Sequence, residues 1–207
     1  MILEGIVTTL DEEGRVNIAP MGPVVPDDYP GAALVTFALL PFRTSRTHAN
    51  LAGCPEGVLH VSDDVLLLAR AAIGEVQPLP PMIDALEVRG RILAEACRAY
   101  EFRVVSRSGD PVRERLVAEV VRTHRLRDAF GFNRAKFAVL EAAILATRVH
   151  LLPPDEIEAD FCRLVRLVEK TGGPCEIEAF ALLQDYVARR GAASHDGPSS
   201  RMAPNPP

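Results

Sequence analysis

The spacing of apolar residues in this chain changes near residue 125, and this change limits the possible folds more than any other feature. Before it, short apolar segments are separated by turn-forming residues; they are "ILEGIVTTL", "RVNIAPMGPVV", "GAALVTFALL", "GVLHVSDD", "ALEVRGRILAEA", "AYEFRVVSR" and "RLVAEVVRTHRL". Sequential short strands with tight turns favour an antiparallel barrel or sandwich over a parallel sheet with crossover helices. After it, apolar residues recur at helical spacing. The sequence therefore predicts an α+β protein, with a β-rich domain over 1–125 and a helical subdomain over 126–191.

The return strand of the first predicted hairpin has two different faces. Alternation puts Val16 and Ile18 on one face. The other face carries Asn17, Ala19 and Met21. Because Pro20 has no amide hydrogen to donate, it belongs at a sheet edge or a bulge. A barrel wall beside a flat ligand would show this pattern, and so would an ordinary edge strand that ends in a turn.

Five segments are predicted to be helical. Two are short: "SRTHANLAG", which ends near Gly53, and "DVLLLARAAIG". The third, "NRAKFAVLEAAILATRVHLL", starts at the N-cap Asn133 and has an apolar face of Phe137, Leu140, Ile144 and Leu145. The fourth, "DEIEADFCRLVRLVEKTGG", opens with Asp155 and Glu158 spaced as a capping box, and the fifth is "PCEIEAFALLQDYVARRG". Residues 192–207 are rich in Pro and Ser without apolar periodicity, so we predict that they are disordered.

Composition argues against several classes of protein. A net charge of −5 over 207 residues does not suit a general nucleic-acid binder, which is more often basic. No stretch has the ~18 uncharged apolar residues of a membrane span, and the N-terminus does not follow a signal-peptide pattern. The four cysteines lack C-x-x-C spacing, so we expect free thiols and no metal site. These features predict a soluble, cytoplasmic protein.

The stretch "PFRTSRTHANL" follows an apolar run and concentrates hydrogen-bond donors. The donors are Arg43, Thr44, Ser45, Arg46, Thr47, His48 and Asn50. Arginine offers a planar fork that matches phosphate oxygens, and a helix that starts here adds free amides and the positive end of its dipole. The segment is therefore a candidate site for a phosphate or another small anion. A solvated loop whose Ser and Thr side chains cap a helix is the alternative.

Two further polar groups have both a structural and a functional interpretation. His60 with Asp63 and Asp64 could bind a metal or run acid–base chemistry, but a helix start explains the two carboxylates more simply. The other group is a basic helix start made of Asn133, Arg134 and Lys136. It is either a solvated surface or a second contact to an acidic ligand. The sequence contains no nucleophile elbow, Walker loop, G-x-G-x-x-G or H-E-x-x-H motif, so any catalysis would depend on a cofactor.

Four stretches, in this order, resemble the FMN-binding split-barrel superfamily, which includes flavin reductases and pyridoxamine-phosphate-oxidase-like proteins. Within it, the chain looks like an uncharacterised family, a domain of unknown function. The stretches are "ILEGIVTTLDEEGRVNIAPMGP", "PFRTSRTHANL", "GVLHVSDDVLLLARAAIG" and "GFNRAKFAVLEAAILATR". The resemblance implies an antiparallel split β-barrel of the FMN-binding type with a C-terminal helical subdomain, and a homodimer with the flavin at its interface.

The resemblance also implies positions for FMN. In flavin reductases of this fold, a strand of the type N-x-A-P runs beside the isoalloxazine ring. The matching residues are Asn17, Ala19 and Pro20, followed by Met21 and Gly22. The phosphate loop of those proteins ends in a threonine with an asparagine three residues on. The matching residues are Thr47 and Asn50, with Arg43, Thr44, Ser45 and Arg46 as further donors.

The function that the resemblance implies is a flavin-dependent oxidoreductase with FMN as cofactor. His48 would then be the side chain that transfers protons, or one more phosphate contact. No segment of the sequence is recognisable as a binding site for NADH or NADPH. Other readings remain open: a non-catalytic flavin carrier or sensor, a deazaflavin or haem in the same groove, or an interaction module without ligand.

Overall fold

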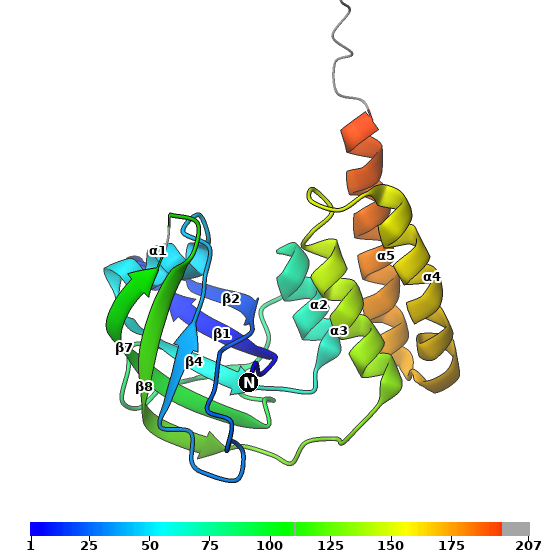
Figure 1. Ribbon diagram of the computed structural model, residues 1–207. Coiled ribbons are helices and arrows are strands. Elements are labelled where there is room, and N and C mark those ends of the chain that lie inside the picture. The colour runs from blue at the N-terminus through cyan, green and yellow to red at the C-terminus, as the bar shows by residue number, and fades with distance from the viewer. Residues whose placement is uncertain (110, 196–207) are drawn as a thin grey trace, which may run out of the picture.

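The computed structural model of the protein describes residues 1–109 and 111–195. Its elements, in chain order, are β1 (Gly5–Leu10), β2 (Val16–Met21), β3 (Thr36–Leu39), α1 (Arg46–Gly53), β4 (Glu56–Val61), α2 (Val65–Ile73), β5 (Met82–Asp84), β6 (Arg91–Leu93), β7 (Arg98–Gly109), β8 (Glu114–Arg125), α3 (Arg134–Ala146), α4 (Pro154–Thr171) and α5 (Pro174–His195). Figure 1 shows the strands with α1 on one side and a bundle of α2, α3, α4 and α5 on the other. α5 extends to His195, and the rest of the segment predicted to be disordered, residues 196–207, lies outside the described part.

Six strands form one antiparallel sheet, in the order β2-β1-β4-β7-β8-β3. β5 and β6 form a separate two-stranded sheet. Isolated bridges join Val24 to Ile2 and to Ala38, which brings the chain after β2 next to β3 at the other edge of the sheet. Among the described strands, no continuous ladder joins β2 to β3, so only isolated bridges connect the two edges of the curved sheet.

Two predicted strands are shorter than expected, and a buried carboxylate explains one of them. β3 covers four residues of "GAALVTFALL", and β6 covers three of "ALEVRGRILAEA". Glu101 on β7 is fully buried and accepts hydrogen bonds from three consecutive amides, those of Leu86, Glu87 and Val88, at 2.9, 2.6 and 3.2 Å. These amides wrap around the carboxylate and cannot continue a sheet ladder, so residues 85–90 form a loop.

His124 on β8 lies on the other side of the same carboxylate, with its Nε2 2.7 Å from Glu101 Oε1. Burial opposes ionisation of Glu101, but the amide and His124 hydrogen bonds outweigh it and hold its pKa below the ordinary value. A charged group in the wall of the barrel is therefore fully paired.

Hydrophobic cores lie on both faces of the β1–β2 hairpin. One core lies inside the curved sheet and includes Val7, Leu39, Leu59, Tyr100, Phe102 and Leu116. The other is shared with α2, α3, α4 and α5, and Ile6 and Ile18 belong to it. Val16 packs against this second core, which confirms that Val16 and Ile18 share the apolar face of β2. The helices therefore cover one face of the hairpin and leave the other toward α1.

α3 begins at its predicted N-cap but buries different residues from those expected. Asn133 Oδ1 accepts from the amide of Lys136 at 3.1 Å. The buried face consists of small side chains: Ala135, Ala138, Val139, Ala142, Ala143 and Ala146. The predicted face of large side chains is confirmed only in part: Leu140 and Leu145 pack against the core, but Phe137 is half exposed. Alanines let α3 approach α2, α4 and α5 closely.

The prediction of a capping box at the start of α4 is wrong. The N-cap is Pro153, which makes no side-chain capping bond, and Pro154 opens the helix. Proline suits the first helical position because its missing N–H would have no partner there and its φ is already helical. Asp155 then lies in the first turn, where its carboxylate interacts favourably with the helix dipole but does not cap the helix.

Candidate functional site

The donor-rich segment at 43–50 forms the entry to α1, as the sequence predicts. Ser45 is the N-cap, and its Oγ accepts from the amide of His48 at 3.2 Å. The hydroxyl hydrogen of Ser45 is left to donate. Arg46 opens the helix, is exposed, and has no ion pair or hydrogen bond from its guanidinium within the described residues. This end of α1 presents donors and a positive dipole to solvent.

The two groups of residues predicted for the ligand meet at the first turn of α1. Asn17 Nδ2 on β2 donates to Thr47 Oγ1 at 3.1 Å. Asn50 Nδ2 donates to Thr9 Oγ1 on β1 at 3.0 Å. Thr47 and Asn50 are 2% and 7% exposed, so both side chains hold α1 against the β1–β2 hairpin. The exposed part of the segment consists of Arg43, Thr44 and Arg46, with Ser45 partly exposed.

Glu114, the first residue of β8, holds the opposite side of α1. Its carboxylate lies 2.9 Å from His48 Nε2, 3.0 Å from Arg107 Nη1 and 3.5 Å from Arg43 Nη2. Arg107 also donates to the carbonyl of Leu51 near the end of α1. Partial desolvation opposes ionisation of Glu114, but the His48 hydrogen bond and the charges of Arg43 and Arg107 hold its pKa below the ordinary value. Three basic groups thus surround one carboxylate beside the entry to α1.

Glu114, Arg107 and Thr9 are candidate-site residues that the sequence does not predict. The first two reach α1 because β7 pairs with β8, a long-range contact without a local signature. The single available signal is a lone carboxylate between Arg113 and Arg115 in the sequence.

β2 is an edge strand, as Pro20 predicts, and Pro20 lies opposite Ile6 in the ladder. Asn17, Ala19 and Pro20 are partly exposed, and Met21 packs partly against the core inside the sheet. Gly22 has a structural reason to lack a side chain. A Cβ there would lie 3.0 Å from Ile2 Cγ2, so the N-terminal segment fills that space.

Asp63 and Asp64 have separate structural partners. Asp64 Oδ1 accepts from the amide of Leu67 at 2.9 Å and caps α2, which confirms the helix-start interpretation. Asp63 binds Arg127, and the amide of Phe130 donates to it at 2.5 Å. The hydrogen bond from Arg127, foremost, lowers the pKa of Asp63 to about 2. His60 is fully buried in β4, away from any exposed surface.

Of the two basic side chains at the start of α3, one has partners and the other has none among the described residues. Lys136 Nζ lies 3.1 Å from Glu176 Oε1 and donates to the carbonyl of Asp63 at 2.6 Å. These contacts tie α3 to α5 and to the start of α2. Arg134 is exposed, and no partner of its guanidinium is found in the described part of the chain.

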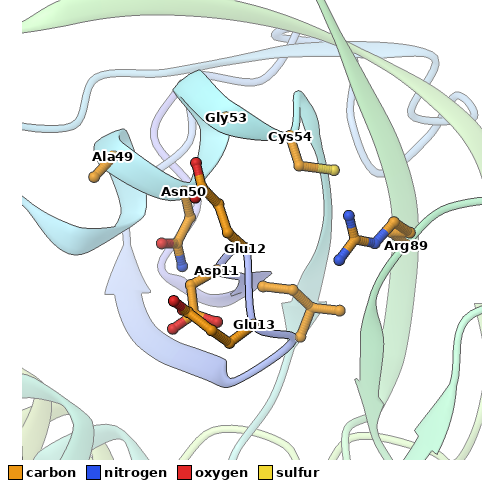
Figure 2. A pocket seen from close by; sticks show the side chains of 9 residues that line it. Asp11, Glu12, Glu13, Ala49, Asn50, Gly53, Cys54 and Arg89 are labelled. Carbon is orange, nitrogen blue, oxygen red and sulfur yellow. The ribbon is translucent and has the colours of Figure 1, made fainter.

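A hollow of about 270 Å³ lies between the β1–β2 turn and the end of α1. Figure 2 shows carboxylates of Glu12, Asp11 and Glu13 on one side of it and the side chains of Cys54 and Arg89 on the other. Asn50 is the one residue it shares with the predicted ligand set. The exposed donors of segment 43–46 lie at the other end of α1, so this acidic hollow is not the predicted anion site.

Within residues 1–109 and 111–195, no three or more His, Cys, Asp or Glu side chains are grouped to hold a metal ion. Cys54, Cys97, Cys162 and Cys175 are all free thiols. In the same described ranges, none of the helices has the length and apolar character needed to cross a membrane.

The solved structures that resemble this one include an FMN-bound protein and a nitroreductase. The FMN-bound protein MM1853 from Methanosarcina mazei, a DUF447 protein, has a TM-score of 0.73 and 24% identity, over 89% of this chain and 94% of its own. The 2-nitrobenzoate 2-nitroreductase NbaA from Pseudomonas fluorescens has a TM-score of 0.50 and 17% identity, over 59% of this chain and 64% of its own. These likenesses confirm the predicted α+β split-barrel fold, and the first one also covers the C-terminal helices.

Sequence profiles of one family match both parts of the chain. The N-terminal domain of a protein of unknown function, DUF447, matches residues 3–127. The DUF447 profile for the C-terminal part matches residues 133–185. Together the profiles cover the whole strand layer and most of the helical bundle, and the chain therefore belongs to the DUF447 family.

Proposed function

We propose that the protein binds FMN non-covalently and acts as a flavin-dependent oxidoreductase. The hydrogen bond from Asn17 to Thr47, at 3.1 Å, carries the proposal. It joins the strand and the loop that the resemblance to flavin reductases assigns to the ring and the phosphate. The DUF447 structure from Methanosarcina mazei is FMN-bound, which supports the same cofactor here.

For the 5′-phosphate we propose the entry of α1. Arg46 and Thr44 are exposed there, and the hydroxyl of Ser45 has a hydrogen to donate. Arg43 adds positive charge, although its guanidinium also forms an ion pair with the carboxylate of Glu114. A dianion at a helix N-terminus is stabilised by the free amides and the dipole, so this donor set fits a phosphate. Thr47 and Asn50 contribute from below the surface, by fixing α1 to the β1–β2 hairpin.

For the isoalloxazine ring we propose the exposed edge of β2, along Asn17, Ala19 and Pro20, with Met21 and Gly22 at its end. The outer side of an edge strand has backbone groups without ladder partners, which can bind the polar edge of a flavin. Asn17 uses its Nδ2 on Thr47, and its Oδ1 is left to accept a hydrogen bond from the ring.

When bound, FMN supplies the electron and hydride transfer, and the residues of this chain bind it, orient it and set the electrostatic environment. The assignment of His48 to proton work stays a prediction. Its Nε2 lies 2.9 Å from Glu114, on the side of α1 that faces β8. From this position His48 also steadies the entry of α1.

We further propose that the protein is a homodimer with FMN at the interface, and that it works in the cytoplasm. The dimer is supported by the resemblance to split-barrel flavoproteins and by the exposed position of the proposed site. The cytoplasm is supported by the free thiols of all four cysteines.

Riboflavin, which lacks the phosphate, provides the test of this site. The affinity of the purified apoprotein for FMN and for riboflavin is measured by fluorescence titration, for the wild type and for Arg46→Ala. A charge-assisted contact is worth about 1.5–3 kcal/mol, so Arg46→Ala should weaken FMN binding by about tenfold or more and leave riboflavin binding unchanged.

Arg166→Ala is the matched control, because Arg166 is an exposed arginine on α4, far from the proposed site in the sequence. It should bind both flavins as the wild type does. Equal FMN affinity in the wild type and in a folded Arg46→Ala variant would refute the phosphate assignment. Bound FMN that neither NADH nor NADPH reduces above the rate of free FMN would favour a carrier or sensor over an oxidoreductase.

A further inference from the structure

Three phenylalanines are exposed together where the strand layer connects to the helical bundle. Phe130, Phe132 and Phe137 are 70%, 98% and 50% exposed. The rings of Phe132 and Phe137 stack, with centroids 6.2 Å apart and planes 30° apart. Exposed apolar surface of this kind, gathered in one place, is characteristic of a binding surface. We call Phe130, Phe132, Arg134 and Phe137 the aromatic platform.

The backbone beneath the aromatic platform is anchored. Asp63, at the start of α2, accepts from the amide of Phe130 and binds Arg127. Lys136 Nζ lies 5.4 Å from the centre of the Phe130 ring and is itself paired with Glu176. These contacts cross from the strand layer to α2 and α5. The rings are therefore presented to solvent by a segment with fixed anchors, which lowers the entropy lost on binding.

The charged side chains around the aromatic platform indicate which kind of ligand it can bind. Around the aromatic platform, Asp63 is neutralised by Arg127 and Glu176 by Lys136. Arg134 is the exception: its exposed guanidinium has no partner among the residues described here. A stacked aromatic pair beside an uncompensated guanidinium is complementary to a flat aromatic anion, and FMN is a flat ring system with a phosphate dianion.

The aromatic platform does not lie over the flavin site of its own chain. In Figure 1, α1 lies at the top of the strand layer, whereas the connection from β8 to α3 runs along the bottom of the molecule. Asn17 binds Thr47 on α1, so a flavin bound there is remote from the β8–α3 connection of the same chain, which carries Phe132. A second copy of the chain can bring the two surfaces together.

We propose that the aromatic platform of one copy covers the FMN bound at β2 and α1 of the other copy, with Phe132 and Phe137 against the ring system and Arg134 toward its anionic groups. Each flavin site is then completed by the partner. This inference rests on the proposed function, because it needs FMN at β2 and α1.

Complementation between two defective variants tests the inference. One variant carries Arg46→Glu, which repels the phosphate but keeps the aromatic platform. The other carries Phe132→Ala and Arg134→Glu, which removes the platform but keeps the phosphate site. Both changes in the second variant are at exposed side chains, so the fold is expected to survive. Each variant alone should bind FMN at least tenfold more weakly than the wild type.

The two variants are then co-expressed with different affinity tags, and the mixed dimer is purified through both tags. If the aromatic platform acts on the partner, one of the two sites in the mixed dimer contains no substitution. The mixed dimer should then bind one FMN with wild-type affinity. If the platform acts within its own chain, neither site regains its missing group and no tight binding returns. If the platform does not touch the flavin, the Phe132→Ala, Arg134→Glu variant already binds FMN normally on its own.

Three outcomes would overturn the inference. They are wild-type FMN affinity in the Phe132→Ala, Arg134→Glu variant, a mixed dimer that binds FMN no better than the single variants, and a wild-type protein that remains monomeric with FMN bound. Leu151→Ala, which removes a comparably exposed apolar side chain between α3 and α4, is the control and should bind FMN normally. A wild-type protein without affinity for FMN would refute the proposed function itself, and is distinguished from the other outcomes in that first titration.

Discussion

At the scale of single residues, the buried His60 shows how a histidine near two aspartates can be structural. The amide of Leu93 donates to its Nε2 at 3.1 Å, so Nδ1 carries the proton and donates to the carbonyl of Ile6, also at 3.1 Å. Both ring nitrogens are used by the backbone, and the ring is fully buried. Burial, foremost, lowers the pKa of His60 from 6.5 to about 4, with a smaller contribution from His124. His60 is therefore a neutral link between β1, β4 and β6.

This link predicts a pH dependence of stability. The unfolded chain takes up a proton on His60 near pH 6.5, and the folded chain only near pH 4. Between these values the unfolded state binds more protons, so the free energy of unfolding falls as the pH falls. The loss from this group should reach on the order of 3 kcal/mol. It is measured by urea denaturation at a series of pH values.

The wild type is compared with His60→Gln and with His150→Gln, which changes an exposed histidine. His60→Gln should start less stable and lose less stability toward low pH. His150→Gln should follow the wild type. Parallel curves for all three proteins would contradict the account of His60.

Residue types were easier to predict than contacts. The sequence singles out Asn17, Thr47 and Asn50, because Asn17 lies on the polar face of a predicted strand and the other two lie in a polar segment after an apolar run. The bonds from Asn17 to Thr47 and from Asn50 to Thr9 follow from pairing of β1 with β2 and from the docking of α1. Glu114 could not be predicted, since its partners come from segments distant in the sequence.

At the scale of elements, α1 is a short helix held from two sides. Thr47 and Asn50 bind the β1–β2 hairpin, and His48 binds Glu114 on β8. A helix of eight residues has little stability of its own, so these contacts decide its position. The proposed phosphate site depends on this position.

Glu114→Gln is predicted to loosen α1 without unfolding the protein. It removes the charge that Arg43, His48 and Arg107 share, and a hydrogen bond to a charged group is worth about 1.5–3 kcal/mol. Amide hydrogen exchange in α1 should become about tenfold faster, and exchange in α3 should not change. Glu119→Gln, at an exposed position of the same strand, is the control. Unchanged exchange in α1 would show that Glu114 does not hold it.

α3 is the element where the pattern in the sequence misled most. Large apolar residues such as Phe137 and Leu140 suggest the core face, yet the fully buried positions are mostly alanines, and Leu140 packs only partly against the core. Alanine is compatible with either face of a helix, so the sequence alone cannot assign it. Only the neighbours α2, α4 and α5 decide which side is covered.

Ala138→Leu is predicted to destabilise the protein by about 1–3 kcal/mol. Ala138 is 1% exposed in a closely packed interface, and extra methyl groups there force neighbouring helices apart. Glu141→Leu changes an exposed position of α3 and should alter stability much less. Urea denaturation measures both. A stable Ala138→Leu variant would contradict close packing through the alanine face.

At the scale of the whole molecule, the strand layer and the bundle share a core. Ile6 and Ile18 from the hairpin pack with residues of α2, α3, α4 and α5. The helices thus stiffen the hairpin whose opposite face contributes Asn17 to the candidate site. The change in the sequence near residue 125 predicts the two layers. It does not predict that α2, from the first part of the chain, joins the bundle, because that depends on the shared core.

The proposed site and function both depend on binding of FMN. The most direct test is the visible absorption spectrum of the purified protein, followed by identification of the compound released by heat. We expect flavin bands and a released compound that matches FMN in mass and spectrum. A colourless protein that also fails to bind added FMN would contradict this expectation, and so would a deazaflavin or haem in the released fraction.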